Sequence, residues 1–143
     1  MESPEPIAER LAALLAAREE ILEAYLFGSW ARGEAQAHSD VDVAVYVDER
    51  SLPRAPYGYD AELASRCMSA LGTNRVDVVV LNHASPLLYH RVLRDGVRLL
   101  ARDLRATTVR EGRALSRYCD YLPQLAKIDA TASARTEQGR FGR

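Results

Sequence analysis

The spacing of apolar residues along the 143-residue chain predicts a helix at the N-terminus, followed by a strand. Leucine and isoleucine recur at helical spacing, and Ser3 followed by Pro4 favours helix initiation, so we predict a helix from there to about Glu23. A short apolar run at 24–27 predicts the first strand. The charged residues of the helix are predicted to form its solvated face: Arg10, Arg18, Glu19, Glu20 and Glu23.

Two valine-rich segments predict the main strands of a sheet. Residues 41–47, VDVAVYV, alternate between apolar and other side chains, as half-buried strands do. Residues 75–81, RVDVVVL, are apolar on both faces, which is typical of a buried central strand. A further short strand is predicted at 97–101.

Three more helices are predicted between and after these strands. One runs over 60–71 and ends at Gly72, and one follows the Ser85-Pro86 start and ends at Gly96. The last spans about 104–128, and Pro123 is predicted to kink or break it. Strands interspersed with helices predict an α/β (α+β) fold with a mixed sheet and helices packed mainly on one face.

Two aspartates, Asp40 and Asp42, open the strand at 41–47. Side chains two residues apart on a strand point to the same face, so the two carboxylates project side by side and repel each other. A divalent cation with a preference for oxygen ligands, such as Mg²⁺, relieves that repulsion. Asp77, on the next valine-rich strand, can complete a three-carboxylate cluster, or alternatively form a salt bridge with Arg75.

A Gly-Ser pair, Gly28 and Ser29, follows the first predicted strand and begins a segment that can form a short helix. Backbone N–H groups and a hydroxyl at the start of a helix suit a phosphate group. Arg32 lies one turn further on, where it either reaches a triphosphate or is a surface arginine. Together with the aspartates, this pattern indicates two-metal nucleotidyl transfer from a nucleotide.

The charge balance, the apolar runs and the cysteines of the chain restrict the classes of function to which it can belong. Nineteen basic residues against twenty acidic ones give no bulk electrostatic attraction to nucleic acid or to an anionic membrane. No apolar run reaches membrane-spanning length, and the N-terminus lacks a secretion signal, so a cytoplasmic protein is expected. Cys67 and Cys119 are predicted to be reduced thiols.

The motifs FGSWARGEA, HSDVDVAVYV and RVDVVVLN resemble the DNA polymerase β-type nucleotidyltransferases, and among them the MNT-type minimal enzymes, over roughly 24–101. The resemblance implies a palm-like fold, with a minimal nucleotidyltransferase domain at 1–104 followed by a helical segment at 105–130. The polar and small residues at 131–143 predict a tail that is disordered or ordered only on binding. The resemblance also implies ATP and two Mg²⁺ ions as co-substrate and cofactor. The residues carried over for these roles are Gly28, Ser29 and Arg32 for the phosphates and Asp40, Asp42 and Asp77 for catalysis and metal.

The same resemblance implies a partner. MNT-type proteins are commonly antitoxins that transfer AMP to a tyrosine hydroxyl of a HEPN ribonuclease toxin, so a hetero-oligomer with such a toxin is expected. Two alternatives remain at this stage: an antitoxin that acts by complex formation alone, and a small nucleotidyltransferase that modifies an antibiotic. The chain lacks the further subdomains of template-dependent polymerases, which argues against a DNA polymerase.

Overall fold

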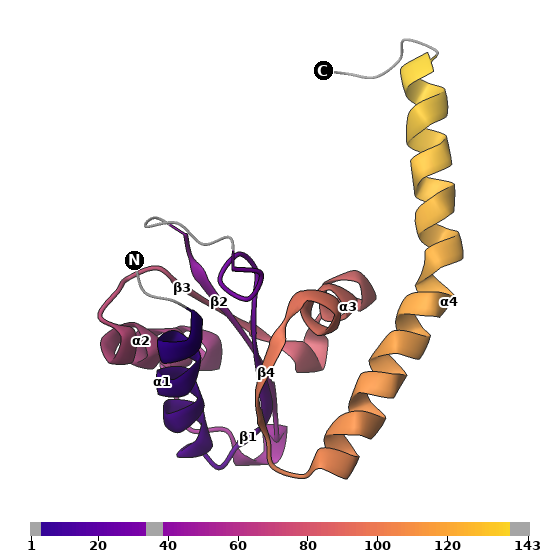
Figure 1. Cartoon of the computed structure of the whole chain (residues 1–143). Helices are drawn as coiled ribbons and strands as arrows, with labels where there is room; N and C mark the ends of the chain where they lie inside the picture. The colour runs from indigo at the N-terminus through magenta and orange to yellow at the C-terminus, as the bar shows by residue number, and fades with distance from the viewer. Residues whose placement is uncertain (1–3, 34–38, 138–143) are drawn as a thin grey trace.

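The computed structural model describes residues 4–33 and 39–137. Figure 1 shows a sheet flanked by helices, with a long C-terminal helix extending past the rest of the domain. The α-helices and strands follow in the order α1 (Pro4–Ala16), β1 (Ile21–Phe27), β2 (Val41–Val47), α2 (Tyr59–Leu71), β3 (Val76–Val80), α3 (Pro86–Asp95), β4 (Val97–Ala101) and α4 (Leu104–Glu137). Two short 3₁₀ turns, η1 (Glu49–Ser51) and η2 (Leu81–His83), follow β2 and β3.

The sheet has the strand order β3-β2-β1-β4 and is mixed. β1 pairs antiparallel with both β2 and β4, whereas β2 and β3 run parallel. The mixed α/β sheet predicted from the sequence is therefore confirmed. The interpretation of β3 as a central strand is wrong, because β3 is an edge strand of this sheet. Its valines contact buried residues on both faces of the sheet, Val76, Val78 and Val80 on one face and Val79 on the other.

The first hydrophobic core lies between the sheet and helices α1 and α2. Alternate residues of β2 point into this core, together with leucines and isoleucines from α1 and residues from α2: Ile7, Leu11, Leu15, Val41, Val43, Val45, Leu63 and Cys67. These side chains are almost inaccessible to water, and each fully buried valine or leucine contributes about 1.5–3 kcal/mol of transfer free energy.

A second core fills the opposite face of the sheet, beneath α3 and α4. It contains the other alternate residues of β1 and β2, with side chains from both helices: Tyr25, Phe27, Ala44, Leu81, Tyr89, Val92 and Ala114. Helices therefore cover both faces, and the prediction that they lie mainly on one face is wrong. A single sequence shows which residues of a helix are apolar but not which face of the sheet they cover.

The N-terminal helix is shorter than its pattern predicts. α1 ends at Ala16, and β1 begins at Ile21. Glu23 lies in β1 with no exposed surface, where it accepts hydrogen bonds from Thr107 and Arg110 of α4. Its assignment to a solvated helix face is therefore wrong, as is that of Glu20, which is buried and accepts hydrogen bonds from Arg18 and Tyr59.

Helices α2 and α3 and strand β4 lie where the sequence predicts them. Gly72 ends α2 with a left-handed backbone conformation, φ 68°. The Ser85 hydroxyl accepts a hydrogen bond from the Leu88 N–H at the start of α3. Ser3, the predicted cap of α1, is outside the described residues. Both cysteines are free thiols, as predicted, and within the described ranges no helix is long and apolar enough to cross a membrane.

Helix α4 is a continuous element of 34 residues that includes Pro123. Figure 1 shows a change of direction about half-way along it, which is the kink that an internal proline produces. The helix continues to Glu137, beyond the predicted end near 128, so residues 131–137 are helical rather than part of a disordered tail. The remainder of that predicted tail, 138–143, is outside the described residues.

Candidate active site

The strand register brings Asp42 and Asp77 together. Asp42 of β2 pairs with Asp77 of β3 on one side and with Phe27 of β1 on the other. Paired residues of neighbouring strands point to the same face, here the face covered by α3 and α4. Asp40 is exposed and comes directly before β2, whose first residue is Val41. The three predicted carboxylates therefore lie at one end of the sheet.

Gly28 is positioned directly against the Asp42 carboxylate. Its backbone is in the left-handed region, with φ 77°. A Cβ atom at this position would lie 2.2 Å from Asp42 Oδ2, well inside van der Waals contact. Only glycine therefore combines this backbone conformation with so close an approach to the acid. The spacing between the Gly-Ser pair and the aspartates thus reflects direct contact between the two motifs.

The backbone after Gly28 folds into consecutive turns. The Arg32 N–H donates to the Gly28 carbonyl at 3.2 Å, and the Gly33 N–H donates to the Trp30 carbonyl at 3.4 Å. The described part, through Gly33, is not a helix, so the predicted helix dipole contributes nothing here. Trp30 is buried in the first core and donates its ring N–H to the Ser39 carbonyl at 3.4 Å, which ties the turn to the residues before β2.

The electrostatics of this end of the sheet are dominated by negative charge. Burial raises the pKa of Asp42 to about 6, and repulsion from Asp77 and Asp40 adds to the shift. The positive charge of Arg32 opposes it. Arg32 is exposed, and it extends from the turn that Gly28 begins. The arrangement therefore places three acids and one arginine around one turn, with the acids in excess.

A family assignment follows from residues 9–105, which match the model of the family described as Polymerase beta, Nucleotidyltransferase. This match covers more than half of the chain and includes every predicted site residue. The chain belongs to the polymerase β nucleotidyltransferase family. Its mixed sheet and the placement of Gly28, Asp42 and Asp77 are the structural counterparts of that match.

Two curated relatives are similar in sequence to about half of the chain. The chain is 37% identical over 78 residues to the protein adenylyltransferase MntA of Aphanizomenon flos-aquae, covering 50% of this chain and 51% of the relative. It is 37% identical over 75 residues to the protein adenylyltransferase MntA of Shewanella oneidensis, covering 52% and 50%. The chain thus spans about half the length of the curated relatives it matches.

Among solved structures, the chain is similar to one chain in the crystal structure of a toxin–antitoxin complex with AMP-PNP. The TM-score is 0.72 at 27% identity, and the match covers 87% of this chain and 98% of the other. The similarity thus extends beyond residues 9–105, the range that the family model matches.

The donor chemistry of this nucleotidyltransferase fits the Mg²⁺ ions that its family implies. Carboxylate oxygens are the preferred ligands, and the raised pKa of Asp42 shows that its ionised form lacks sufficient positive charge nearby. In 4–33 and 39–137, no group of three or more histidine, cysteine or acidic side chains is placed to hold a metal ion by itself. An open set is expected for Mg²⁺, which usually takes one or two carboxylates and completes its shell with phosphates and water.

Asp77 differs in one respect from its prediction. It is exposed, because β3 is the edge of the sheet, and therefore it is not an ion buried in a central strand. The argument that burial demands a partner for Asp77 fails. The register with Asp42 replaces it, because like charges directly opposite each other on adjacent strands are destabilising, and a shared cation relieves that repulsion.

Two polar contacts that sequence reasoning missed fix α4 to β1, the strand that ends directly before Gly28. Glu23 binds Arg110 at 2.6 Å, and the Tyr25 hydroxyl donates to Glu111 at 2.7 Å. Both β1 residues lie on the face of Asp42, towards the other end of the strand. The signal in the sequence is weak: a single acid in an apolar run, and a threonine and an arginine three residues apart about 85 positions later.

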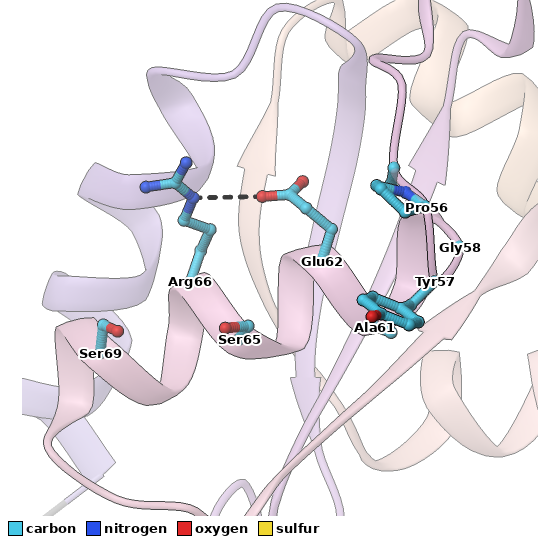
Figure 2. A pocket seen from close by; sticks show the side chains of 9 residues that line it. Pro56, Tyr57, Gly58, Ala61, Glu62, Ser65, Arg66 and Ser69 are labelled. Carbon is cyan, nitrogen blue, oxygen red and sulfur yellow. Dashed lines mark hydrogen bonds and ion pairs between the residues drawn. The ribbon is translucent and has the colours of Figure 1, made fainter.

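A separate cavity of about 390 Å³ lies on the outer side of α2, lined by Tyr57, Glu62, Ser65, Arg66 and others. Figure 2 shows the Glu62–Arg66 ion pair across its wall. None of the predicted site residues lines this cavity. It lies near the N-terminus of α2, where Tyr59 contacts Glu20 just before β1, so it is at the opposite end of β1 from Gly28.

Proposed function

We propose that this chain is an antitoxin that transfers AMP from ATP to a tyrosine hydroxyl of a cognate HEPN ribonuclease toxin, in the cytoplasm. The observation that carries the proposal is the position of Asp42, which lies against Gly28 on one side and pairs with Asp77 on the other. A phosphate-binding turn in contact with a carboxylate pair is the arrangement that nucleotidyl transfer requires.

Each site residue has a role in this proposal. Gly28 and Ser29 bind the β- and γ-phosphates through the turn, and Arg32 supplies positive charge to the same phosphates. Asp40, Asp42 and Asp77 would hold the two Mg²⁺ ions, which would supply charge stabilisation at the transferred phosphate. The tyrosine oxygen forms a bond to the α-phosphorus, the bond between the α-phosphorus and the bridging oxygen breaks, and pyrophosphate leaves. Asp77 accepts the proton from the tyrosine.

A protein acceptor is supported by the relatives. Both curated relatives are protein adenylyltransferases, and the similar solved structure is a toxin–antitoxin complex with a nucleotide analogue. In this chain, the helices and strands form one sheet domain with a projecting α4. AMP on a tyrosine at an RNA-cleaving site blocks that site by its bulk and its negative charge.

A second candidate is an antitoxin that neutralises its partner by binding alone. The long α4, whose distal half projects past the sheet in Figure 1, favours it, because a projecting helix is a surface for a partner. The raised pKa of Asp42 favours catalysis. An acid whose ionised form destabilises the free protein is typical of a catalytic or metal-binding site and is not required for binding a partner.

Intact-mass spectrometry of a candidate HEPN toxin, after incubation with this chain, ATP and Mg²⁺, tests the proposal. The toxin is expected to gain one or more AMP units with the wild-type chain and none with Asp42→Asn. Asp60→Asn is the matched control, because Asp60 is an exposed acid at the start of α2. A toxin that stays unmodified but forms a stable complex would establish the binding antitoxin instead.

A further inference from the structure

A small pocket of about 170 Å³ lies where β2, η2, α3 and α4 meet. It is lined by Tyr46, Leu81, Asn82, Tyr89, Arg110, Arg113, Ala114 and Arg117. Tyr46 is on the same face of β2 as Asp42 but four residues further along, which is about 13 Å away at 3.3 Å per residue. The pocket is therefore separate from the candidate active site, and no predicted site residue lines it.

Three arginines of α4 line this pocket. Arg110, Arg113 and Arg117 are spaced by three and four residues, so they share one side of the helix. The charge of Arg110 is compensated by Glu23, at 2.6 Å. Arg113 and Arg117 are exposed, and neither forms an ion pair within the part of the chain that the structure describes. Two uncompensated positive charges therefore line the pocket.

These arginines belong to a basic region, although the total charge of the chain is nearly balanced. Residues 86–120, which include α3, β4 and the first half of α4, contain eight arginines and four acidic residues. This segment therefore carries four more positive than negative charges, whereas the aspartates of the candidate active site precede it in the chain.

Tyr89 is the deepest polar side chain of the pocket. It is 4% exposed, and its ring packs in the second core, under the guanidinium of Arg117 at 5.9 Å from the ring centre. Its hydroxyl makes no hydrogen bond to any residue in 4–33 or 39–137. Burial raises the pKa of Tyr89, so the hydroxyl is a neutral donor. Within the described residues no water-inaccessible side-chain oxygen or nitrogen lacks a hydrogen-bond partner, so the Tyr89 hydroxyl reaches water and can donate to a ligand oxygen.

We propose that this pocket binds a phosphate group, either inorganic phosphate or the phosphate of a mononucleotide. The Tyr89 hydroxyl, at the base, and the guanidinium groups of Arg113 and Arg117, at the rim, supply donors from different directions. Such a set matches the several oxygens of a tetrahedral anion better than the two of a planar carboxylate. The volume accommodates a phosphate but not a whole nucleotide, whose base would lie outside. The site does not depend on the proposed AMP transfer.

The test measures phosphate binding by isothermal titration calorimetry with the full chain in EDTA, so that no divalent cation occupies the acidic end of the sheet. Inorganic phosphate and AMP are titrated separately, at constant ionic strength maintained with chloride. The wild-type chain is expected to bind one phosphate group saturably. Tighter binding of AMP would identify the nucleotide as the source, and equal binding would identify free phosphate.

Two variants and one control locate the site. Tyr89→Phe removes only the hydroxyl, and Arg117→Gln removes one rim charge; each is expected to weaken binding about tenfold, as the loss of a hydrogen bond to a charged group does. Arg105→Gln is the matched control, because Arg105 is an exposed arginine of α4 that does not line the pocket. The proposal is overturned if the wild-type chain shows no saturable binding, or if Arg105→Gln weakens binding as much as the other two variants.

Discussion

Two acids on one face of the sheet, Glu23 and Asp42, are in opposite electrostatic situations. Glu23 has no exposed surface, yet it accepts hydrogen bonds from Thr107 and from two nitrogens of Arg110. Asp42 is less buried, yet its pKa is raised to about 6, because partial burial removes water from its carboxylate and its charged neighbours include two more acids. The charged and polar partners of each acid, and not its burial alone, therefore decide which acid stabilises the fold and which is available for a ligand.

Substitutions of the two acids are expected to differ most in their effect on the rate of the proposed AMP transfer. Asp42→Asn is expected to lower the rate of the proposed AMP transfer by about 10³-fold, because the variant removes a carboxylate that is proposed to hold Mg²⁺ at the transferred phosphate. Glu23→Gln is expected to change the rate by less than about tenfold, since Glu23 lies near the other end of β1. Single-turnover rates measured by mass spectrometry check both values. Equal losses in the two variants would contradict the separation of roles.

For the stability of the fold, Glu23 is expected to contribute more than Asp42. Glu23→Ala is expected to destabilise the fold by about 3 kcal/mol, because it leaves the part-buried Arg110 without its partner. Urea denaturation measures the change, with Glu9→Ala as a control at an exposed acid of α1. A loss below about 1 kcal/mol would show that α4 is held by packing alone.

The contact between Gly28 and Asp42 is tested by two glycine substitutions. Gly28→Ala and Gly33→Ala both place a side chain at a left-handed backbone, φ 77° and 72°, which costs about 1–2 kcal/mol. Only Gly28→Ala also displaces the Asp42 carboxylate, since nothing lies within 4 Å of a Cβ at Gly33. Gly28→Ala is therefore expected to be the more destabilising and to weaken Mg²⁺ binding. Combining it with Asp42→Ala should abolish the difference between the two glycines.

The smallest expected effect is a gain in stability. In the folded chain the pKa of Asp42 is about 6, above its ordinary value of 3.8, so the metal-free wild type loses stability as the pH rises from about 4 to 6. Asp42→Asn does not titrate, and its melting temperature is expected to exceed that of the wild type at pH 7 by about 2–4 °C. The two should converge near pH 4, and Mg²⁺ should narrow the gap at pH 7. Identical melting curves at both pH values would show that Asp42 is not strained.

The sequence predicts most elements of this fold because their signals are local. The alternation at 41–47, the Ser85-Pro86 start of α3 and the Gly72 end of α2 each depend on a few neighbouring residues. Those local signals do not determine which strand is central. The prediction that β3 is central is wrong because packing on both faces gives an edge strand the same valine-rich composition as a central strand. The role of Glu23 was missed for a related reason, because its partners are more than 80 residues away.

For the candidate site, the spacing of Gly28, Asp40 and Asp42 was sufficient to propose the chemistry, and the structure adds the contact that explains it. The short helix after Ser29 was not found in the described residues, because the backbone up to Gly33 forms turns instead. The pocket at Tyr89 was beyond sequence reasoning, since its residues come from four elements, each of which is unremarkable alone.

The register of Asp42 with Asp77 has a consequence for how this chain tolerates changes in length. The two acids are 35 positions apart, but their alignment depends only on the pairing of β2 with β3. Residues inserted at 52–58, between η1 and α2, would lengthen a surface connection without moving either acid. One residue inserted within β3 ahead of Asp77 would turn this carboxylate to the opposite face of the sheet. Natural or engineered insertions should therefore accumulate in the first segment and be absent from the second.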